Sequence, residues 1–372
     1  MRLSVRIMRS QTIDKPFLWV VVILILAGLF IFSSAVLGLL ARDAEQVANI
    51  AFNQLLFGVV FGVGVLLTTL NIPYKTWRRY SLYIFCISLI LTAAVFIPNL
   101  GLNHGGATRW LVLGPFSFQP SELLKFGFVV YFAAWLSAAK DNASTFRYGT
   151  MPLIIMLVLV GGLLLKQPDT GTFSVIFVTG LGMLIASGGK WRHAIGLVLI
   201  AVIGLLALAS FKPYVKDRID TFLNPADDPQ GASYQIQQSL IAVGSGEFFG
   251  RGFGQSVQKF RYLPEPVGDS IFAVAAEEFG FTGSVFIVLL FLFFAIRGFS
   301  IAEHAPDQFS RLLVVGIVIL ITAQSYTNIA AMLGVFPLTG LPLIFISHGG
   351  TAMLASLAGV GIILNISRYI NS

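Results

Sequence analysis

A carboxylate stands where a polar segment meets a long apolar run. Residues 262–278 read YLPEPVGDSIFAVAAEE, and the uncharged stretch FGFTGSVFIVLLFLFFAI follows at 279–296. An aspartate just before a helix can cap the helix N-terminus. It can equally serve as a general base at a membrane surface, so both interpretations of Asp269 stay open here. Glu277 and Glu278 must face a polar cavity or a partner, because a carboxylate facing lipid costs free energy.

Asp269 is not expected to form a close carboxylate pair within its own helix. At roughly 100° per residue, Glu277 lies about 80° around the helix from Asp269, and Glu278 lies on the opposite side. Both glutamates also lie about 12 Å or more along the helix axis. A base at Asp269 would therefore have to work with groups from other segments.

A second charged motif is QPSELLK at residues 119–125. Glu122 and Lys125 are i,i+3 neighbours on one helix face, a spacing that allows a local ion pair. The same pair, set near the membrane surface, could line a polar cavity, since ionisable residues within a membrane usually serve function. The two interpretations are compatible.

Two further motifs combine charge with turn or aromatic residues. KQPDTGT at 166–172 places Lys166 and Asp169 on a tight turn, where Asp169 as the cap of the next helix is the favoured reading. In the stretch 105–122, Arg109 precedes Trp110. Trp110 fits an interfacial aromatic belt. The pair could equally form an amphipathic surface that binds a sugar or lipid head group, with Arg109 facing a phosphate.

The elements that must position these groups are membrane helices. The chain has 372 residues, of which 56% are hydrophobic and only 11% charged, and its mean hydropathy is +0.85. A soluble domain carries about 25% charged residues. We therefore predict an all-α polytopic membrane protein with about ten transmembrane helices. The expected spans are 17–40, 51–70, 80–98, 121–138, 151–165, 170–187, 192–211, 270–296, 309–335 and 346–368.

The first apolar run, 17–40, is longer than a signal-peptide core of about 7–15 residues, so we expect it to be a retained helix. A large extracytoplasmic loop, 212–269, is expected between the seventh and eighth helices of the domain 17–368. The tails 1–16 and 369–372 are expected in the cytoplasm, because 14 of the 24 lysine and arginine residues fall on their side. This bias also accounts for the net charge of +7, which needs no nucleic-acid partner.

The sequence lacks the motifs of several common classes of enzyme and transporter. The sequence has no P-loop, GxSxG or CxxC pattern, which argues against ATP-driven transport and common hydrolase chemistry. Its four histidines are scattered without a metal-ligand spacing, and the single cysteine, Cys86, cannot form an intrachain disulfide. The outer side, where the acidic residues gather, is the expected place for a site.

Together the motifs resemble the SEDS family, which includes the RodA and FtsW proteins of the bacterial cell wall. The resemblance runs from the first span to the last and is closer to the FtsW/SpoVE branch. Its motifs are GPFSFQPSELLK, QPDTGT, YQIQQSLIAVGSGEFFGRGFGQSVQKFRYLPEP, IFAVAAEEFGFTG and PLTGLPLIFISHGGTAML.

The resemblance implies a peptidoglycan glycosyltransferase that polymerises lipid II on the outer face of the cytoplasmic membrane. The family's essential acid falls on Asp269, expected as the general base of an inverting reaction. Its other motif residues fall on Trp110, Glu122 and Lys125. Candidates for binding substrate, including its diphosphate, are Arg109, Trp110, Glu122, Lys125, Lys166, Asp169, Arg251 and Lys259. A divalent cation, Mg²⁺ or Mn²⁺, held by Asp269 or another outer acid is a further expectation.

The resemblance also implies partners, namely a class B penicillin-binding protein with transpeptidase activity and other divisome or elongasome membrane proteins, at the septum or along the cell wall. Two alternatives stay open: a lipid II flippase, and an inactive divisome scaffold. The scaffold interpretation rests on Val267 and Gly268, which depart from the family pattern beside the expected base. Further departures from that pattern are Ser270, Ile344 and His348.

Overall fold

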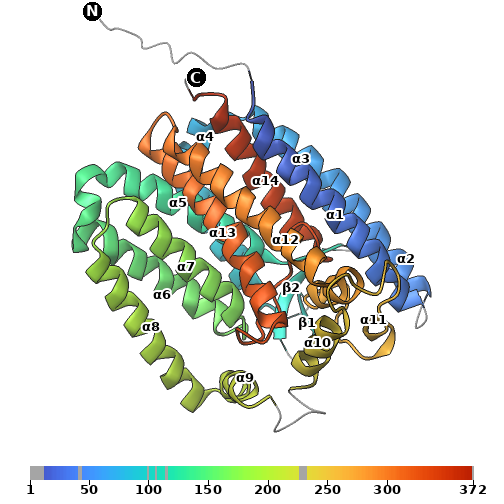
Figure 1. The fold of residues 1–372 in the computed structure, drawn as a ribbon. Helices are drawn as coiled ribbons and strands as arrows, with labels where there is room; N and C mark the ends of the chain where they lie inside the picture. Colours follow the sequence, from blue (N-terminus) through green and yellow to red (C-terminus); the bar gives the residue numbers. More distant parts are fainter. Residues whose placement is uncertain are drawn as a thin grey trace, which may run out of the picture.

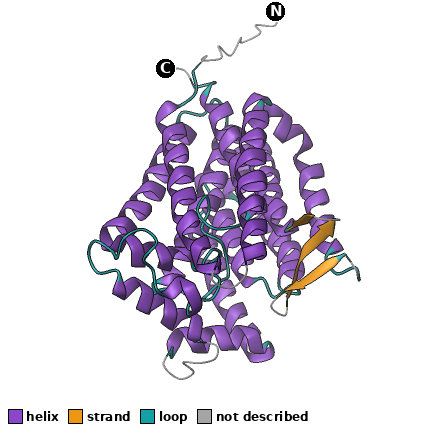
Figure 2. Cartoon of the chain, turned by 90° about the vertical axis from the view of Figure 1, so that its right-hand side faces the viewer, coloured by secondary structure: helices purple, strands orange, loops and turns teal. Residues whose placement is uncertain are grey.

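The computed structural model describes residues 12–40, 44–98, 100–104, 107–113, 116–225 and 233–370. They form a bundle of long helices with a small sheet on one flank (Figures 1 and 2). Helix α1 (Lys15–Leu40) begins, and helix α14 (Gly350–Ser367) ends, at the same end of the bundle. The opposite end carries the sheet and the short helices α9 to α11, and we call it the loop end (Figure 1).

Ten helical rods in the described chain match the ten expected spans. Eight of them are long and apolar enough to cross a membrane. The other two are α4, whose first turns carry Lys75, Arg78 and Arg79, and α7, which has only 17 residues. Between α1 and α14 the rods are α2 (Ala44–Asn53) continued by the π-helix η1 (Gln54–Val60) and α3 (Phe61–Asn71), α4 (Tyr74–Ala94), α5 (Pro120–Ala139), α6 (Met151–Leu164), α7 (Thr170–Ala186), α8 (Trp191–Phe211), α12 (Ile271–Glu303) and α13 (Gln308–Met332).

Helix α13 is the centre of the bundle. It packs against α5, α7, α12 and α14, and most of its side chains are buried. Helix α5 packs against α4 on its other side, and α14 packs against α3. Short 3-10 and π turns, η2 (Lys140–Ser144) and η3 (Phe146–Thr150), connect α5 to α6.

The expected all-α membrane fold is confirmed, and the described residues add one small three-stranded antiparallel sheet to it. The sheet consists of β1 (Gly101–His104), β2 (Ala107–Leu113) and β3 (Phe116–Phe118), in that spatial order. Leu102 lies opposite Trp110, and Val112 lies opposite Ser117. The strands are only three to seven residues long, too short for an alternating pattern to stand out in the sequence. The sheet connects α4 to α5 at the loop end.

The expected large loop contains helices. Residues 212–269 include α9 (Pro213–Leu223), α10 (Tyr234–Ser245) and α11 (Gln258–Arg261), and α10 packs against α12 and α13. The polar segment is therefore folded onto the bundle around the N-terminal end of α12.

Helix α12 is broken near the loop end, where the sequence predicted one continuous span. Gly280 has φ 64° and ψ −161°, a conformation that only glycine adopts readily. The glycine-rich segment 246–252 satisfies the backbone groups that the break exposes. Arg251 N and Gly252 N donate to the carbonyls of Glu277 and Glu278, while Phe281 N and Thr282 N donate to the carbonyls of Glu247 and Phe248.

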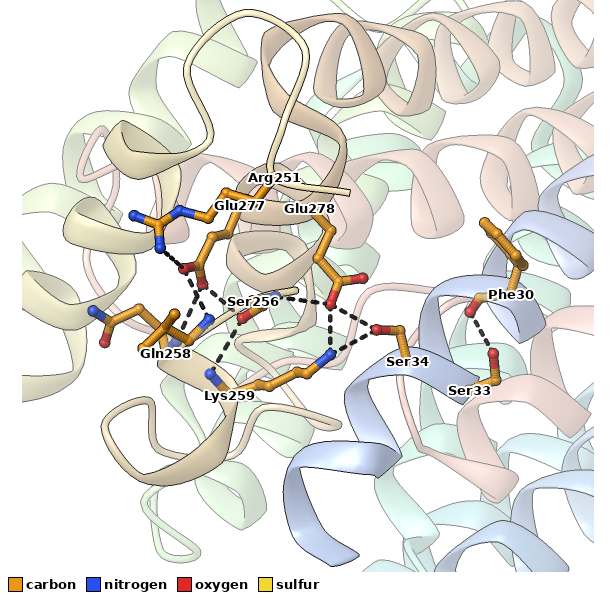
Figure 3. A network of polar contacts seen from close by, with 10 residues as sticks. Phe30, Ser33, Ser34, Arg251, Ser256, Gln258, Lys259, Glu277 and Glu278 are labelled. Atoms are coloured by element: carbon orange, nitrogen blue, oxygen red, sulfur yellow. Dashed lines mark hydrogen bonds and ion pairs between the residues drawn. The ribbon is translucent and has the colours of Figure 1, made fainter. Parts of the chain in front are cut away.

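The two glutamates before the break join three segments (Figure 3). Glu278 forms a fully buried ion pair with Lys259 of α11, with 2.6 Å between Oε1 and Nζ. Ser34 of α1 donates to the same oxygen at 2.6 Å and accepts from Lys259 Nζ at 2.8 Å. Glu277 accepts from the Ser256 hydroxyl at 2.6 Å and from the backbone N–H groups of residues 257 and 258. The network, which we call the Lys259–Glu278 latch, ties α1 and α12 to the segment that leads to Asp269.

The segment between α13 and α14, residues 333–349, is non-helical, and its part 341–347 is buried except for the half-buried Pro342. A side-chain Cβ at Gly28, in the middle of α1, would lie 2.1 Å from the carbonyl oxygen of Phe345. The segment therefore re-enters the bundle to the depth of the middle of α1. The segment covers the gap between the expected spans 309–335 and 346–368, and α14 begins at Gly350 rather than at 346.

We expect Gly280→Ala to destabilise the protein. The added Cβ would lie 2.3 Å from Gly250 N, in a backbone conformation unsuited to alanine. The strain should cost about 2 kcal/mol or more, read as a lower thermal unfolding temperature in detergent. Gly64→Ala in α3 is the matched control, because nothing lies within 4 Å of its Cβ position. An unchanged unfolding temperature for Gly280→Ala would contradict the break.

We expect Lys259→Met to be strongly destabilising, because it leaves the buried Glu278 carboxylate without its counter-charge. Breaking a buried pair by removing one partner costs about 3–5 kcal/mol. Adding Glu278→Gln should restore part of the lost thermal stability, and Arg261→Met, an exposed change on the same helix, should have little effect. Equal losses for Lys259→Met and Arg261→Met would refute the latch.

Candidate functional site

Asp269 lies at the loop end, two residues before α12 begins, with contacts from three other segments. Its Oδ1 accepts a hydrogen bond from Gln235 Nε2 of α10 at 3.1 Å. Its backbone carbonyl accepts from Asn328 Nδ2 of α13 at 2.7 Å, and the same amide donates to the Leu341 carbonyl at 2.8 Å. A Cβ at Gly340 would lie 3.9 Å from Asp269 Oδ2. The carboxylate therefore sits where α10, α12, α13 and the re-entrant segment converge.

Desolvation dominates the titration of Asp269. The pKa of its carboxyl group is raised from 3.8 to about 6, chiefly by burial and to a smaller extent by the nearby Glu265 carboxylate. The hydrogen bond from Gln235 and the charge of Arg218 lower it in part. A carboxylate with a pKa near 6 is ionised at neutral pH and accepts a proton more readily than an ordinary aspartate.

The interpretation of Asp269 as a helix cap is wrong. The N-cap position of α12 is Ser270, and neither residue's side chain makes a capping hydrogen bond. The Asp269 carboxylate instead accepts from Gln235, which also donates to Ser270 Oγ at 3.0 Å. An amide brought from α10 has replaced the local cap, so the carboxylate is not tied to its own helix.

Asp169 does cap its helix, as expected. Its Oδ1 accepts from Thr172 N at 3.1 Å, and its Oδ2 accepts from the Thr172 hydroxyl at 2.9 Å. The Asp169 side chain is buried. This cap fixes the turn 167–170 at the loop end, beside the re-entrant segment.

Two arginines gather on that turn. Arg109 of β2 donates from Nε to the Gln167 carbonyl at 3.1 Å and from Nη2 to the Pro168 carbonyl. Arg218 of α9 donates from Nη1 to Thr170 Oγ1 at 2.9 Å. Burial lowers the pKa of Arg218, and the charge of Arg109 lowers it further, while Asp169 and Asp269 act in the opposite direction. The two guanidinium groups are thus close enough to interact.

Glu122 and Lys125 form the expected local ion pair, at 2.8 Å and with both side chains buried. Lys125 Nζ also donates to Gln324 Oε1, and Gln324 Nε2 donates to the Pro342 carbonyl at 3.1 Å. A cavity of about 10 Å³ lies beside the pair, room for roughly one water molecule. The pair therefore reaches the re-entrant segment through Gln324, one helical turn before Asn328.

The remaining predicted residues lie elsewhere. The Lys259 ammonium is enclosed in the latch, and Arg251 reaches Glu277 Oε1 at 3.7 Å on the same side of the α12 break. Lys166 is exposed, and Trp110 is partly buried in β2. As placed, Lys259 offers no exposed face to a phosphate group. The structure therefore brings Asp269, Arg109 and Asp169 together and separates them from Lys259 and Arg251.

Sequence analysis missed Gln235, Asn328 and Arg218. Gln235 lies in the quoted motif YQIQQSL, where repeated glutamines on an otherwise apolar helix were a usable signal. Asn328 and Gln324 are amides in the largely apolar span 309–335, and a buried amide needs a hydrogen-bond partner. No sequence pattern pointed to Arg218, because its contact with the turn before α7 joins segments that are far apart in the sequence.

Within the described residues, no three Asp, Glu, His or Cys side chains gather as metal ligands. One oxygen of Asp269 faces an amide donor rather than an open side. The side chains present therefore do not make a divalent-cation site by themselves, and the expected cation stays a prediction. Mg²⁺ commonly takes one or two carboxylates together with substrate phosphates, which leaves Asp269 as one ligand at most in such a complex.

The site combines a carboxylate of raised pKa with two guanidinium groups at the loop end of the bundle. A base of this kind can accept a hydroxyl proton, and guanidinium groups bind phosphate oxygens in pairs. The arrangement fits transfer of a group from a phosphate ester to a hydroxyl.

Comparison with known proteins gives a consistent result. The chain is 40% identical over 319 residues to stage V sporulation protein E of Bacillus subtilis, covering 86% of this chain and 87% of that protein. It is 38% identical over 359 residues to a probable peptidoglycan glycosyltransferase FtsW of Trichlorobacter lovleyi, covering 96% and 94%.

Solved structures agree with this fold. A chain of a peptidoglycan synthase complex, described as coordinating polymerization and crosslinking, superposes with a TM-score of 0.79 at 27% identity, covering 96% of this chain and 98% of that one. The rod shape determining protein RodA of Thermus thermophilus superposes with a TM-score of 0.67 at 27% identity, covering 96% and 97%. The model of the cell cycle protein family FtsW/RodA/SpoVE matches residues 15–372. The chain belongs to the FtsW/RodA/SpoVE family of polytopic membrane proteins.

Proposed function

We propose that this chain is a peptidoglycan glycosyltransferase that polymerises lipid II, with Asp269 as its general base. The observation that carries the proposal is the Asp269 carboxylate, held by Gln235 and raised in pKa by burial. It stands at the loop end beside Arg109 and Arg218. Relatives that align over nearly the whole chain bear the name probable peptidoglycan glycosyltransferase.

The reaction joins a sugar hydroxyl to an anomeric carbon that bears a lipid diphosphate. Forming a β-linkage from an α-linked donor inverts the anomeric carbon and requires one in-line displacement, by analogy with inverting glycosidases. The acceptor hydroxyl gives its proton to Asp269, and its oxygen bonds to the anomeric carbon. The bond to the diphosphate oxygen breaks, and the electron pair leaves with the lipid diphosphate.

The setting follows from the same proposal. The loop end faces outward, both termini lie in the cytoplasm, and the lipid tail of the substrate enters the bundle from the bilayer. The partners are a class B penicillin-binding protein, which cross-links the strands, and other membrane proteins of the divisome or elongasome. A structural neighbour that belongs to a peptidoglycan synthase complex supports such a partnership.

Purified protein with lipid II, alone and with its cognate transpeptidase, tests the function. Wild type should form polymer, and Asp269→Asn should lose at least about 100-fold in rate, because proton transfer to the base is removed. Asp220→Asn, an exposed change on α9, should retain activity. Since burial disfavours the ionised carboxylate, Asp269→Asn should be at least as thermally stable as wild type at neutral pH.

Each outcome points to a different function. Equal polymer from wild type and Asp269→Asn would remove Asp269 from the chemistry. No polymer from wild type even with the partner, but movement of labelled lipid II across liposomes, would select the flippase. Neither polymer nor movement would select the scaffold.

The rate should depend on pH through Asp269. Its pKa is raised to about 6, and only the ionised form accepts a proton. The turnover rate at saturating lipid II should therefore rise tenfold per pH unit below about pH 6 and level off above it. Initial rates between about pH 4.5 and 8 measure this, and a flat profile down to pH 4.5 would contradict an essential base with this pKa.

A further inference from the structure

Two cations share one short turn at the loop end. The three hydrogen bonds from Arg109 and Arg218 all end on residues 167–170, and their acceptors are two backbone carbonyls and a hydroxyl. None of these acceptors carries a charge. Within the described residues, the guanidinium groups are thus held in place by neutral oxygens alone, and only part of each group is engaged.

The local charge is not balanced by an ion pair. Within the described residues, neither arginine forms a salt bridge. Asp169, a carboxylate close enough to act on the charge of Arg218, directs both oxygens to Thr172. Arg218 is partly buried, and its guanidinium is destabilised by burial and by the charge of Arg109. Two cations placed together under partial desolvation favour an anion that both can bind.

The pair lies close to the proposed base. A Cβ at Gly171, directly after Thr170, would lie 2.9 Å from the Thr339 carbonyl and 3.2 Å from the Leu341 side chain. Gly340, between those two residues, has its Cβ position 3.9 Å from Asp269 Oδ2. Only the turn 339–341 therefore separates the beginning of α7 from the Asp269 carboxylate. An anion held by the arginines would lie beside the base.

We infer that Arg218, together with Arg109, binds the diphosphate of the glycosyl donor. This inference rests on the proposed function and assigns the leaving group its site. Guanidinium forks match phosphate oxygens bidentately, and the N-terminal end of α7, a 17-residue helix, adds partial positive charge. When the glycosidic carbon–oxygen bond breaks, the diphosphate gains a negative charge. The arginines therefore stabilise the product side of the reaction as well as the bound substrate.

Binding of lipid II by full-length protein in nanodiscs tests the inference without turnover. In an Asp269→Asn background, Arg218→Gln should weaken lipid II binding by about 10-fold or more, as expected for loss of a charge-assisted contact. Lys216→Gln, an exposed change of equal charge on the same helix, should bind like the parent. Inorganic diphosphate should compete with lipid II for the parent and compete less well for Arg218→Gln.

Two further variants separate binding from a structural role. Thr170→Val removes the Arg218 hydrogen bond to Thr170 but keeps the cation, so lipid II binding should fall less than in Arg218→Gln. Arg218→Lys keeps the positive charge but lacks the planar guanidinium group, so its loss of lipid II affinity should be intermediate. This variant also tests the site if Arg218→Gln fails to fold. Equal losses for Thr170→Val and Arg218→Gln would reduce Arg218 to a structural residue.

The result is independent of the test of Asp269. Parent-like affinity in a folded Arg218→Gln or Arg218→Lys protein would overturn the diphosphate site, whatever the polymerisation assay gives. Conversely, an active Asp269→Asn protein would refute the proposed base while the loss of affinity in Arg218→Gln still upheld the site. If lipid II and inorganic diphosphate both fail to bind the parent, the diphosphate site is overturned.

Discussion

Backbone that is not helical must find hydrogen-bond partners inside a membrane bundle, because no water is available there. Residues 333–349 enter the bundle to the depth of Gly28 on α1. Buried amides from two rods, Gln54 on η1 and both Gln324 and Asn328 on α13, supply their partners. Gln54 Nε2 donates to the Ser347 carbonyl, and Gln54 Oε1 accepts from Gly349 N. On α13, Gln324 donates to the Pro342 carbonyl and Asn328 donates to the Leu341 carbonyl. The π-helix η1, which carries Gln54, is a local distortion of the kind often found at functional sites.

The same requirement positions the candidate base. The Asn328 side-chain amide donates both to the Asp269 carbonyl and to the Leu341 carbonyl of the re-entrant segment. Gln324, one turn earlier on α13, connects that segment to the Glu122–Lys125 pair. Glu122 and Lys125 neutralise each other, so neither of these two buried charges is isolated. Asp269 is held by amides and keeps a raised pKa, whereas a direct ion pair would have lowered it.

The sequence predicted what depends on local spacing. Hydropathy located ten spans, and i,i+3 spacing gave the Glu122–Lys125 pair, while a turn before an apolar run gave the Asp169 cap. The sequence did not predict interactions between residues that are far apart along the chain. Lys259 and Glu278 pair over a sequence separation of 19 residues. They lie next to a helix break at Gly280 that the uncharged stretch 279–296 conceals, since a glycine in an apolar run gives no sign of φ 64°. The prediction that Asp269 caps its helix was wrong for the same reason, because the donor that binds its carboxylate, Gln235, comes from another helix.

The departures from the family pattern beside Asp269 leave its placement intact. Val267 acts through its backbone, whose carbonyl accepts from His348 N at 2.7 Å. Gly268 N donates to the Glu265 carbonyl, and a Cβ at Gly268 would lie 3.2 Å from Glu265 Oε2, so a larger residue would crowd that carboxylate. Ser270 shares the Gln235 amide with Asp269. The Asp269 carboxylate and carbonyl are held by Gln235 and Asn328, and neither contact uses a side chain at 267 or 268. The unusual residues therefore give no structural reason to regard the site as inactive.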